Sequence, residues 1–372
     1  MEVRRIKKFF KSIDFITISI IFALFCIGIV ALYSAGGGLE GDSSEASKQL
    51  IWFGVGFVLM LIIMSVDYEV WGKLWIYFYA FMILMLFLVL FTEPINGATS
   101  WFNIGSVSIQ PSEFSKIILI VGLAKVLTYF SEKKKINKFS SLLVILSIVV
   151  IPILLIAKQP DYGTAMVLLV ISFIMIFSAG ISLWYIFGTI IAGAASLPLI
   201  YLYVLPSHAK ARIEVFLNPQ LDPLGAGYNI IQSMLAVGSG QMWGMGLFNG
   251  NQTQLGYLPM RTTDFIYSVI GEEMGFVISL LVVVLFVLLI VRIFFVAKKA
   301  KDLFGTLVAV GIGSLFLAHF IENVGMTIGL MPITGIPLPF VSYGGSSMIT
   351  NFIAIGILLS INRKRKRNMF LE

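Results

Sequence analysis

The sequence predicts an all-α polytopic membrane protein with about ten transmembrane helices and a long extracytoplasmic loop before helix eight. Two observations lead to this fold class. The 372 residues are 58% hydrophobic and 12% charged, and a soluble domain of that composition would lack the polar surface to cover its core. The apolar residues also gather in runs of about 20, which is the length that spans a bilayer as a helix.

Ten apolar runs mark the predicted helices, which are joined mostly by short polar segments. The runs cover residues 14–34, 49–66, 73–91, 112–130, 140–157, 163–179, 183–205, 264–297, 303–330 and 344–361. The first run follows a basic segment, but it is long enough to span and no small-residue cleavage site follows it, so we expect a retained helix. No repeat is evident, and residues 1–372 are expected to form a single membrane domain.

Lysine and arginine clusters predict the orientation of these helices. The clusters flank predicted helices at four places, and they comprise Arg4, Arg5, Lys7, Lys8, Lys11, Lys133, Lys134, Lys135, Lys138, Lys298, Lys299, Lys301 and residues 363–367. With the N-terminus in the cytoplasm, all four clusters fall on the cytoplasmic side, as the positive-inside rule requires. We therefore expect both termini to be cytoplasmic, and we attribute the net charge of +7 to topology and not to nucleic-acid binding. The one cysteine, Cys26, lies within the first run, so a disulfide is excluded.

The longest joint, about residues 206–262, precedes helix eight and is expected on the extracytoplasmic side. Loops beyond about 12–15 residues are uncommon unless they work as lids or binding loops, so this joint is a candidate binding segment. Within it, Ile230, Ile231, Met234 and Leu235 follow helical spacing. The helix that they predict lies either in the membrane interface or against the transmembrane bundle, and the sequence leaves both open.

Residues 261–273 place three carboxylates, Asp264, Glu272 and Glu273, at the start of predicted helix eight. A charge in the hydrocarbon region costs at least about 2.5–3.5 kcal/mol, so it is retained mainly where it faces a polar cavity. Asp264 is either a helix cap, which free N–H groups and the helix dipole favour, or a functional group. Projected at about 100° per residue, Glu272 lies nearer to Asp264 than Glu273 does. We expect Glu272 to share the cavity and Glu273 to contact a neighbouring helix, with structural pairing as the alternative for both.

Residues 106–116 open the fourth predicted helix on the extracytoplasmic side. Pro111 suits the first helical turn and Glu113 complements the helix dipole, which are ordinary structural roles. Lys116 opposes the dipole one turn inside the helix, so it requires an anion. That anion is either Glu113, three residues earlier on nearly the same face, or a bound phosphate. A pyrophosphate would suit Lys116 and the free N–H groups together.

Residues 331–347 form a loop that enters the tenth predicted helix. The loop holds Pro332, Pro337 and Pro339 together with several glycines, which fix an irregular backbone. At membrane depth such backbone persists only where it is buried in protein or lines a cavity. The loop is either a structural re-entrant turn or one wall of a lipid-substrate groove.

Six segments, in order along the chain, resemble the SEDS family, the shape, elongation, division and sporulation proteins. They are residues 110–116, 158–165, 217–228, 254–259, 263–273 and 335–347. The stretches at 158–161 and 254–259 resemble the elongation members more than the division members. The resemblance implies a ten-helix peptidoglycan glycosyltransferase of the bacterial cytoplasmic membrane. Such an enzyme polymerises lipid II at the outer face during cell elongation and rod-shape maintenance, and releases undecaprenyl pyrophosphate.

The resemblance also implies functional residues, a cofactor and partners. Asp264 matches the family's essential aspartate, Glu113 and Lys116 match its functional acid and lysine, and Asp161 and Ser342 match further motifs, expected to bind substrate. A divalent cation, Mg²⁺ or Mn²⁺, is implied, with Asp264 or Glu113 as candidate ligands. The implied partners are lipid II and the nascent glycan strand, a class B penicillin-binding protein acting as transpeptidase, elongation-complex membrane proteins and membrane lipids, but no nucleic acid.

The implied chemistry needs a base and a charge clamp. Asp264 either accepts the proton of the attacking sugar hydroxyl or holds a metal that activates it. Lys116, with or without a metal near Glu113, would stabilise the leaving pyrophosphate. The sequence departs from the family pattern at Met260 and Thr262, where relatives commonly carry Glu and His, so a direct chemical role is in question at those two positions.

Two other function classes remain open from the sequence. A lipid II flippase would also be polytopic, but it should carry acids and bases across the membrane midplane and often shows repeated halves. A structural scaffold of a cell-wall complex would need no clustered carboxylates. The gathering of polar residues in the extracytoplasmic half favours the enzyme.

Overall fold

The computed structural model describes residues 14–37, 44–94, 98–105, 107–204, 207–225 and 227–369. Its elements, in chain order, are α2 (Phe15–Ala35), α3 (Ser44–Ser65), α4 (Tyr68–Lys73), α5 (Trp75–Leu88), η1 (Val89–Phe91), β1 (Phe102–Ile104), β2 (Val107–Ile109), α6 (Pro111–Glu132), α7 (Phe139–Lys158), α8 (Tyr162–Ser178), α9 (Leu183–Leu199), η2 (Ile200–Val204), α10 (Ser207–Leu217), η3 (Pro219–Leu221), α11 (Tyr228–Ser239), α12 (Asn251–Gln254), α13 (Ile266–Lys298), α14 (Leu303–Thr327) and α15 (Gly345–Met369). The predicted basic cluster at residues 4–11 lies outside the described residues.

The predicted all-α fold class is confirmed. Within the described ranges, eight helices are long and apolar enough to cross a membrane, and two shorter apolar segments, Trp75–Phe91 and Tyr162–Ser178, correspond to the remaining two predicted helices. The antiparallel hairpin of β1 and β2, which pairs Phe102 with Ile109, is a small addition that the sequence did not predict.

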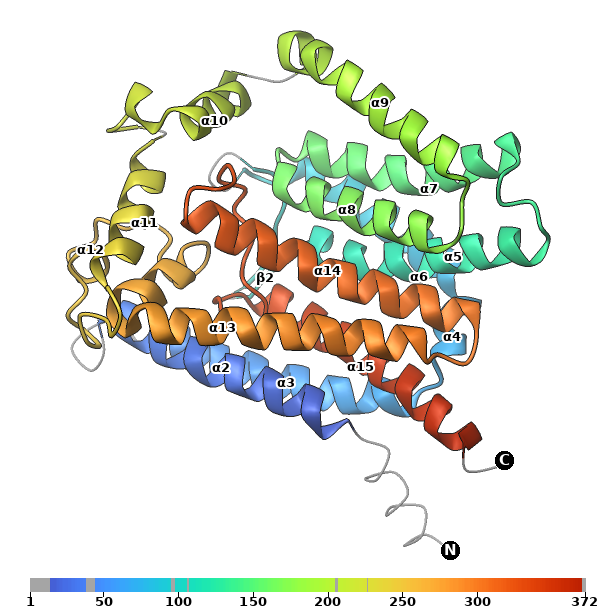
Figure 1. Ribbon diagram of the computed structural model, residues 1–372, viewed down its shortest axis with the longest axis horizontal. Coiled ribbons are helices and arrows are strands. Elements are labelled where there is room, and N and C mark those ends of the chain that lie inside the picture. Colours follow the sequence, from blue (N-terminus) through green and yellow to red (C-terminus); the bar gives the residue numbers. More distant parts are fainter. Residues whose placement is uncertain are drawn as a thin grey trace, which may run out of the picture.

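Successive membrane helices alternate in direction, which gives the bundle two distinct ends (Figure 1). One end carries α11 and α12 and is called the loop end; the other carries the start of α2 and the end of α15 and is called the terminal end. The starts of α6, α8, α13 and α15 and the end of α14 therefore meet at the loop end. Short helices and turns from distant parts of the sequence are brought together there.

The buried centre of the bundle consists of α6, α14 and α15. In these helices 67%, 78% and 83% of the most apolar membrane-length window is buried, against none of it in the peripheral α9. Side chains on the central helices are thus shielded from lipid by the surrounding helices. This shielding explains why α6 and α14 can carry charged residues near the loop end.

The segment between α9 and α13 is folded into short helices. Its α11 packs on α13 and α14 through Ile230, Ser233 and Ala236, while Met234 stays half exposed. The hydroxyls of Ser233 and Ser268 share a hydrogen bond of 2.7 Å. These contacts match the alternative of packing on the bundle; of the four apolar residues at helical spacing, Ile230 is buried there, whereas Met234 and Leu235 are exposed.

Helix α13 consists of two segments joined at Gly275, not the continuous helix predicted for residues 264–297. Gly275 has φ +77°, a conformation that glycine adopts without strain. The loop 241–246 replaces the helical hydrogen bonds lost at the break. Its N–H groups donate to the carbonyls of residues 272 and 273, and its carbonyls accept from the N–H groups of residues 276 and 277. Backbone groups at membrane depth need such partners, so the break and the inserted loop form one unit.

Replacing Gly275 by alanine is expected to destabilise the protein by about 1–3 kcal/mol, because positive φ is strained for a residue with a Cβ. The added Cβ would also overlap the backbone nitrogen of Gly244 in the inserted loop. Thermal unfolding in detergent should show a lower Tm. Gly54→Ala is the matched control, since a Cβ there meets no atom within 4 Å. Equal Tm values for the two variants would contradict this account of the break.

Candidate active site

Asp264 lies in the turn that precedes α13. The helix begins at Ile266 with Phe265 as its N-cap, so Asp264 lies one residue before the N-cap position. The helical projection from Asp264 to Glu272 fails because Asp264 is not part of the helix. Its position is set instead by how the backbone of the turn is held.

Three consecutive carbonyls of this turn are held by residues from the end of α14 and the loop before α15. The N–H of Tyr343, the hydroxyl of Ser342 and the side-chain amide of Asn323 donate, in that order, to the carbonyl oxygens of residues 262–264. The three distances are 2.9, 2.6 and 2.8 Å. These bonds fix the backbone that carries the Asp264 carboxylate.

The same two side chains also hold the proline-rich loop. The Asn323 amide donates to the carbonyl oxygen of Ile336 at 2.8 Å, and the Ser342 hydroxyl accepts from the N–H of Leu338 at 2.8 Å. Ser342 is buried, and both hydrogen bonds of its hydroxyl go to backbone groups. The structural re-entrant turn is therefore the alternative that the contacts of Ser342 match.

The Asp264 carboxylate faces this proline-rich loop. A Cβ added to Gly335 would lie 3.5 Å from Asp264 Oδ2, and Gly335 has φ +73°. On the other side of the loop, a Cβ added to Gly163 would lie 2.6 Å from the Thr334 carbonyl oxygen. Residues 334 and 335 thus separate the carboxylate from the start of α8.

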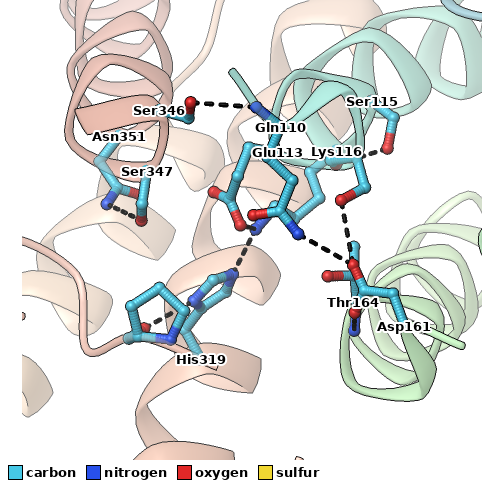
Figure 2. A network of polar contacts seen from close by, with 12 residues as sticks. Gln110, Glu113, Ser115, Lys116, Asp161, Thr164, His319, Ser346, Ser347 and Asn351 are labelled. Atoms are coloured by element: carbon cyan, nitrogen blue, oxygen red, sulfur yellow. Dashed lines mark hydrogen bonds and ion pairs between the residues drawn. The ribbon is translucent and has the colours of Figure 1, made fainter. Parts of the chain in front are cut away.

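Lys116 is the centre of a buried polar cluster at the start of α6 (Figure 2). Its Nζ lies 2.6 Å from Glu113 Oε1 and 2.9 Å from His319 Nε2, and all three side chains are almost fully buried. His319 Nδ1 lies 3.1 Å from the Pro337 carbonyl oxygen. Because a carbonyl can only accept, Nδ1 carries the hydrogen and Nε2 accepts from the lysine. His319 is thus a neutral acceptor, and the anion that Lys116 requires is Glu113.

Asp161 joins the starts of α8 and α6 (Figure 2). Its Oδ1 accepts from the Thr164 N–H at 3.1 Å, which caps α8. Its Oδ2 accepts from the side chains of Gln110 and Ser112, both at 3.1 Å. The Gln110 N–H in turn donates to the Ser346 hydroxyl at 3.2 Å, so the start of α15 is tied to the same point. The sequence placed Asp161 in a functional motif, and the structure brings it next to the Lys116 helix.

Glu272 and Glu273 both bind α12. The Glu272 carboxylate accepts from the N–H of Gln252 at 2.7 Å and from the N–H and hydroxyl of Thr253 at 3.0 and 2.6 Å. Glu273 Oε1 accepts from the Gln254 side chain at 2.7 Å. Glu273 thus contacts a neighbouring helix, as expected, and Glu272 contacts the same short helix. Structural pairing is the alternative that these contacts match.

Three buried polar residues of α14, His319, Glu322 and Asn323, were not predicted to have a role in the site. The spacing i, i+3 and i+4 places the three on one face of α14, a signal that could have identified them as a site. Asn323 positions the Asp264 turn and His319 holds Lys116. Glu322 is buried and attracted to Lys116, and its Oε2 has no hydrogen-bond partner among the described residues.

The described residues do not form a metal-binding cage. No three or more His, Cys, Asp or Glu side chains come together in that part of the chain in a way that could hold a metal ion. Glu113, one of the candidate ligands, is paired with the Lys116 ammonium, which competes with a bound cation.

Comparison with known proteins places the chain in a family. A model of the FtsW/RodA/SpoVE cell cycle proteins matches residues 15–367. The chain is 36% identical to the peptidoglycan glycosyltransferase RodA of Treponema pallidum, over 98% of this chain and 100% of that protein. It is 39% identical to stage V sporulation protein E of Bacillus subtilis, over 95% and 97% of the two chains. It is 34% identical to the peptidoglycan glycosyltransferase MrdB of Escherichia coli, over 93% and 92%.

Solved structures agree with this assignment. A chain from work on the structural coordination of polymerization and crosslinking by a peptidoglycan synthase complex superposes with a TM-score of 0.83 at 28% identity, covering 95% of this chain and 98% of that one. The rod shape determining protein RodA of Thermus thermophilus superposes with a TM-score of 0.69 at 27% identity, covering 95% and 97%. The resemblance to SEDS proteins is confirmed over nearly the whole length. The chain belongs to the FtsW/RodA/SpoVE family of cell cycle proteins and is a multi-pass membrane protein.

Proposed function

We propose that the protein is a peptidoglycan glycosyltransferase that polymerises lipid II at the outer face of the cytoplasmic membrane during cell elongation and rod-shape maintenance. Two relatives matched over nearly their whole length are named peptidoglycan glycosyltransferases. The observation that carries the proposal is the rigidly held Asp264 turn, because the three carbonyl bonds fix a carboxylate at the loop end of the bundle. A base in a fixed place is what the transfer reaction needs.

The loop end is assigned to the extracytoplasmic side. The described basic clusters, residues 133–138, 298–301 and the start of 363–367, all lie at turns or helix ends of the terminal end. The positive-inside rule then puts the terminal end, with both chain termini, in the cytoplasm. Asp264 and the buried Lys116 cluster then lie at the end of the bundle next to the compartment where the glycan grows. Their position supports polymerisation and not charge movement across the midplane.

Asp264 is assigned as the general base. The 4-hydroxyl oxygen of the acceptor sugar attacks the anomeric carbon of the lipid-linked donor, and the bond from that carbon to the pyrophosphate oxygen breaks. The configuration inverts from the α-linked lipid to a β linkage, and the hydroxyl proton passes to the Asp264 carboxylate. Undecaprenyl pyrophosphate leaves with the electron pair.

Lys116 is assigned as the cation that stabilises the leaving pyrophosphate. Two of its three N–H donors are directed to Glu113 and His319, and the third has no hydrogen-bond acceptor among the described residues. Asp161 and Ser342 serve this site by holding its backbone, and Glu272 serves it by holding α12 against α13.

The divalent cation that the family resemblance implies would need ligands from the substrate, because the described residues bring no three suitable side chains together. Mg²⁺ commonly binds one or two carboxylates together with substrate phosphates, and Asp264 is the carboxylate that would fit that pattern here. Titration of the purified enzyme with a chelator and with Mg²⁺ or Mn²⁺ measures whether polymerisation depends on a cation.

A class B penicillin-binding protein, a transpeptidase that crosslinks the strands, is the proposed partner, together with other membrane proteins of the elongation complex. Support comes from the structural match to a chain of a peptidoglycan synthase complex. The proposed function is tested by supplying lipid II to the purified protein, alone and with this partner, and resolving the glycan products by gel. Absence of polymer in both cases, with lipid II movement across vesicles instead, would support a flippase and refute the enzyme.

Asn323→Leu is expected to lower kcat for polymerisation by about 10–100-fold with a smaller effect on KM, because displacement of a catalytic group by about 1 Å costs this much. The substitution removes the donor that holds the carbonyl oxygens of Asp264 and Ile336. Kinetics with fluorescent lipid II measure both constants. Asn351→Leu is the matched control, since that buried amide contacts Ser347 on its own helix. An unchanged kcat in the Asn323 variant would refute the positioning role.

A further inference from the structure

A groove of about 810 Å³ runs between α5 and α7. Its walls are apolar and include Leu84 and Phe87 of α5 and Leu154 and Leu155 of α7, and it ends at Lys158 and Tyr162. The lining residues occupy the last turns of both helices before the loop end. The groove therefore lies in the half of the membrane that is next to the candidate active site.

The groove opens toward the bilayer. Leu84, Phe87 and Leu154 are 51%, 50% and 57% exposed, so a hydrocarbon chain can lie against them. Its lining covers about eight residues of each helix, a length of about 12 Å at 1.5 Å per residue. That length corresponds to part of one leaflet, so the groove suits the first units of a lipid chain whose headgroup lies at the outer surface.

Lys158 places a positive charge at the headgroup end of the groove. The side chain is exposed and forms no ion pair with any described residue. A cation at the end of α7 is favoured by the helix dipole, which is its simpler role. The same ammonium group also complements a phosphate. The groove therefore offers an apolar channel for a hydrocarbon chain and, at its end, a cation for the phosphate to which such a chain is attached.

A short chain of contacts links this end of the groove to Asp264. Lys158 and Tyr162 flank Asp161, whose carboxylate holds the start of the Lys116 helix. Gly163 packs on the carbonyl of Thr334. The next residue, Gly335, faces the Asp264 carboxylate. A headgroup held at Lys158 therefore lies beside the loop that lines the candidate active site.

We propose that the α5–α7 groove binds the polyprenyl chain of the incoming lipid-linked saccharide, with Lys158 contacting its pyrophosphate. This inference rests on the proposed function and adds a place for one of its two lipid substrates. The buried Lys116 serves the pyrophosphate that leaves, whereas the exposed Lys158 serves the pyrophosphate that stays attached to the acceptor. An open, lipid-facing groove allows that substrate to enter from the bilayer.

Two substitutions test the groove by kinetics. Leu154→Trp fills the channel and Lys158→Gln removes the charge, and each is expected to raise KM for lipid II about tenfold with little change in kcat. Leu169→Trp is the matched control, because Leu169 is a similarly exposed leucine of α8 outside the groove. Unchanged KM values in both groove variants would overturn the proposal.

A binding readout separates this inference from the proposed function. A photoreactive phenylalanine at Leu84, in otherwise wild-type and in Asp264→Asn protein, should crosslink radiolabelled lipid II in nanodiscs of phosphatidylglycerol. Excess undecaprenyl pyrophosphate should suppress the crosslink in both backgrounds, and Leu154→Trp should abolish it. If the photoreactive group at Leu84 crosslinks only phosphatidylglycerol and not lipid II, the proposal is overturned, even if the enzyme polymerises. Crosslinking without polymerisation in the wild type would retain the lipid site and refute the enzyme.

Discussion

Asp264→Asn is expected to reduce glycan polymerisation by about 10²–10⁴-fold, the contribution of a general base. Asparagine keeps the size of the side chain and the carbonyl that Asn323 holds, but the amide does not accept the hydroxyl proton. The measurement is the initial rate with lipid II, with the partner transpeptidase present when the wild type requires it. The Tm should stay close to that of the wild type, because the turn is held through its backbone.

Glu93→Gln provides the matched control for this loss. Glu93 is an exposed carboxylate that follows η1, at the same end of the bundle, and it lies away from the contacts that hold the Asp264 turn. Its rate should equal that of the wild type. Equal rates in the Asp264→Asn protein and the wild type would exclude Asp264 as the base. They would favour the hypothesis that this chain is a structural scaffold of a cell-wall complex.

Lys116→Met is expected to have the second largest effect, a loss of about 10²–10³-fold in the polymerisation rate, typical of removing one group that stabilises transition-state charge. This variant should also lose about 3–5 kcal/mol of stability, because it leaves the buried Glu113 carboxylate without its partner. The rate and the Tm are both measured, since misfolding alone would also lower the rate.

A double variant separates the two effects. Glu113→Gln combined with Lys116→Met removes both buried charges, so it should recover much of the stability and none of the activity. Lys125→Met controls for the loss of a lysine, because Lys125 lies in the C-terminal half of the same helix. Recovery of both rate and Tm in the double variant would show that Lys116 is structural and would refute the pyrophosphate clamp.

Helical periodicity and hydrophobicity predicted most of the architecture. The ten apolar runs correspond to helical segments, because about 20 apolar residues have no other stable state in a bilayer than a helix. Most bounds differ by five residues or fewer, but the last helix continues eight residues beyond its run, to Met369. The break at Gly275 was missed because a glycine within a long apolar run leaves the periodicity intact. The loop 241–246 that supplies its hydrogen bonds comes from more than 25 residues earlier, which no local pattern reveals.

In the candidate site too, some features of single residues follow from the sequence and others only from the tertiary structure. The sequence by itself determined that charged groups must gather outside the lipid, and it identified Asp264, Glu113, Lys116 and Asp161 by charge placement and motif. Only the tertiary structure decided what each one contacts. Asn323 holds the Asp264 turn across 59 residues and His319 accepts from Lys116 across 203, while Glu272 is directed to α12. A hydrogen bond depends on distances of a few tenths of an ångström between groups far apart in the chain, and these distances are set by how the helices pack.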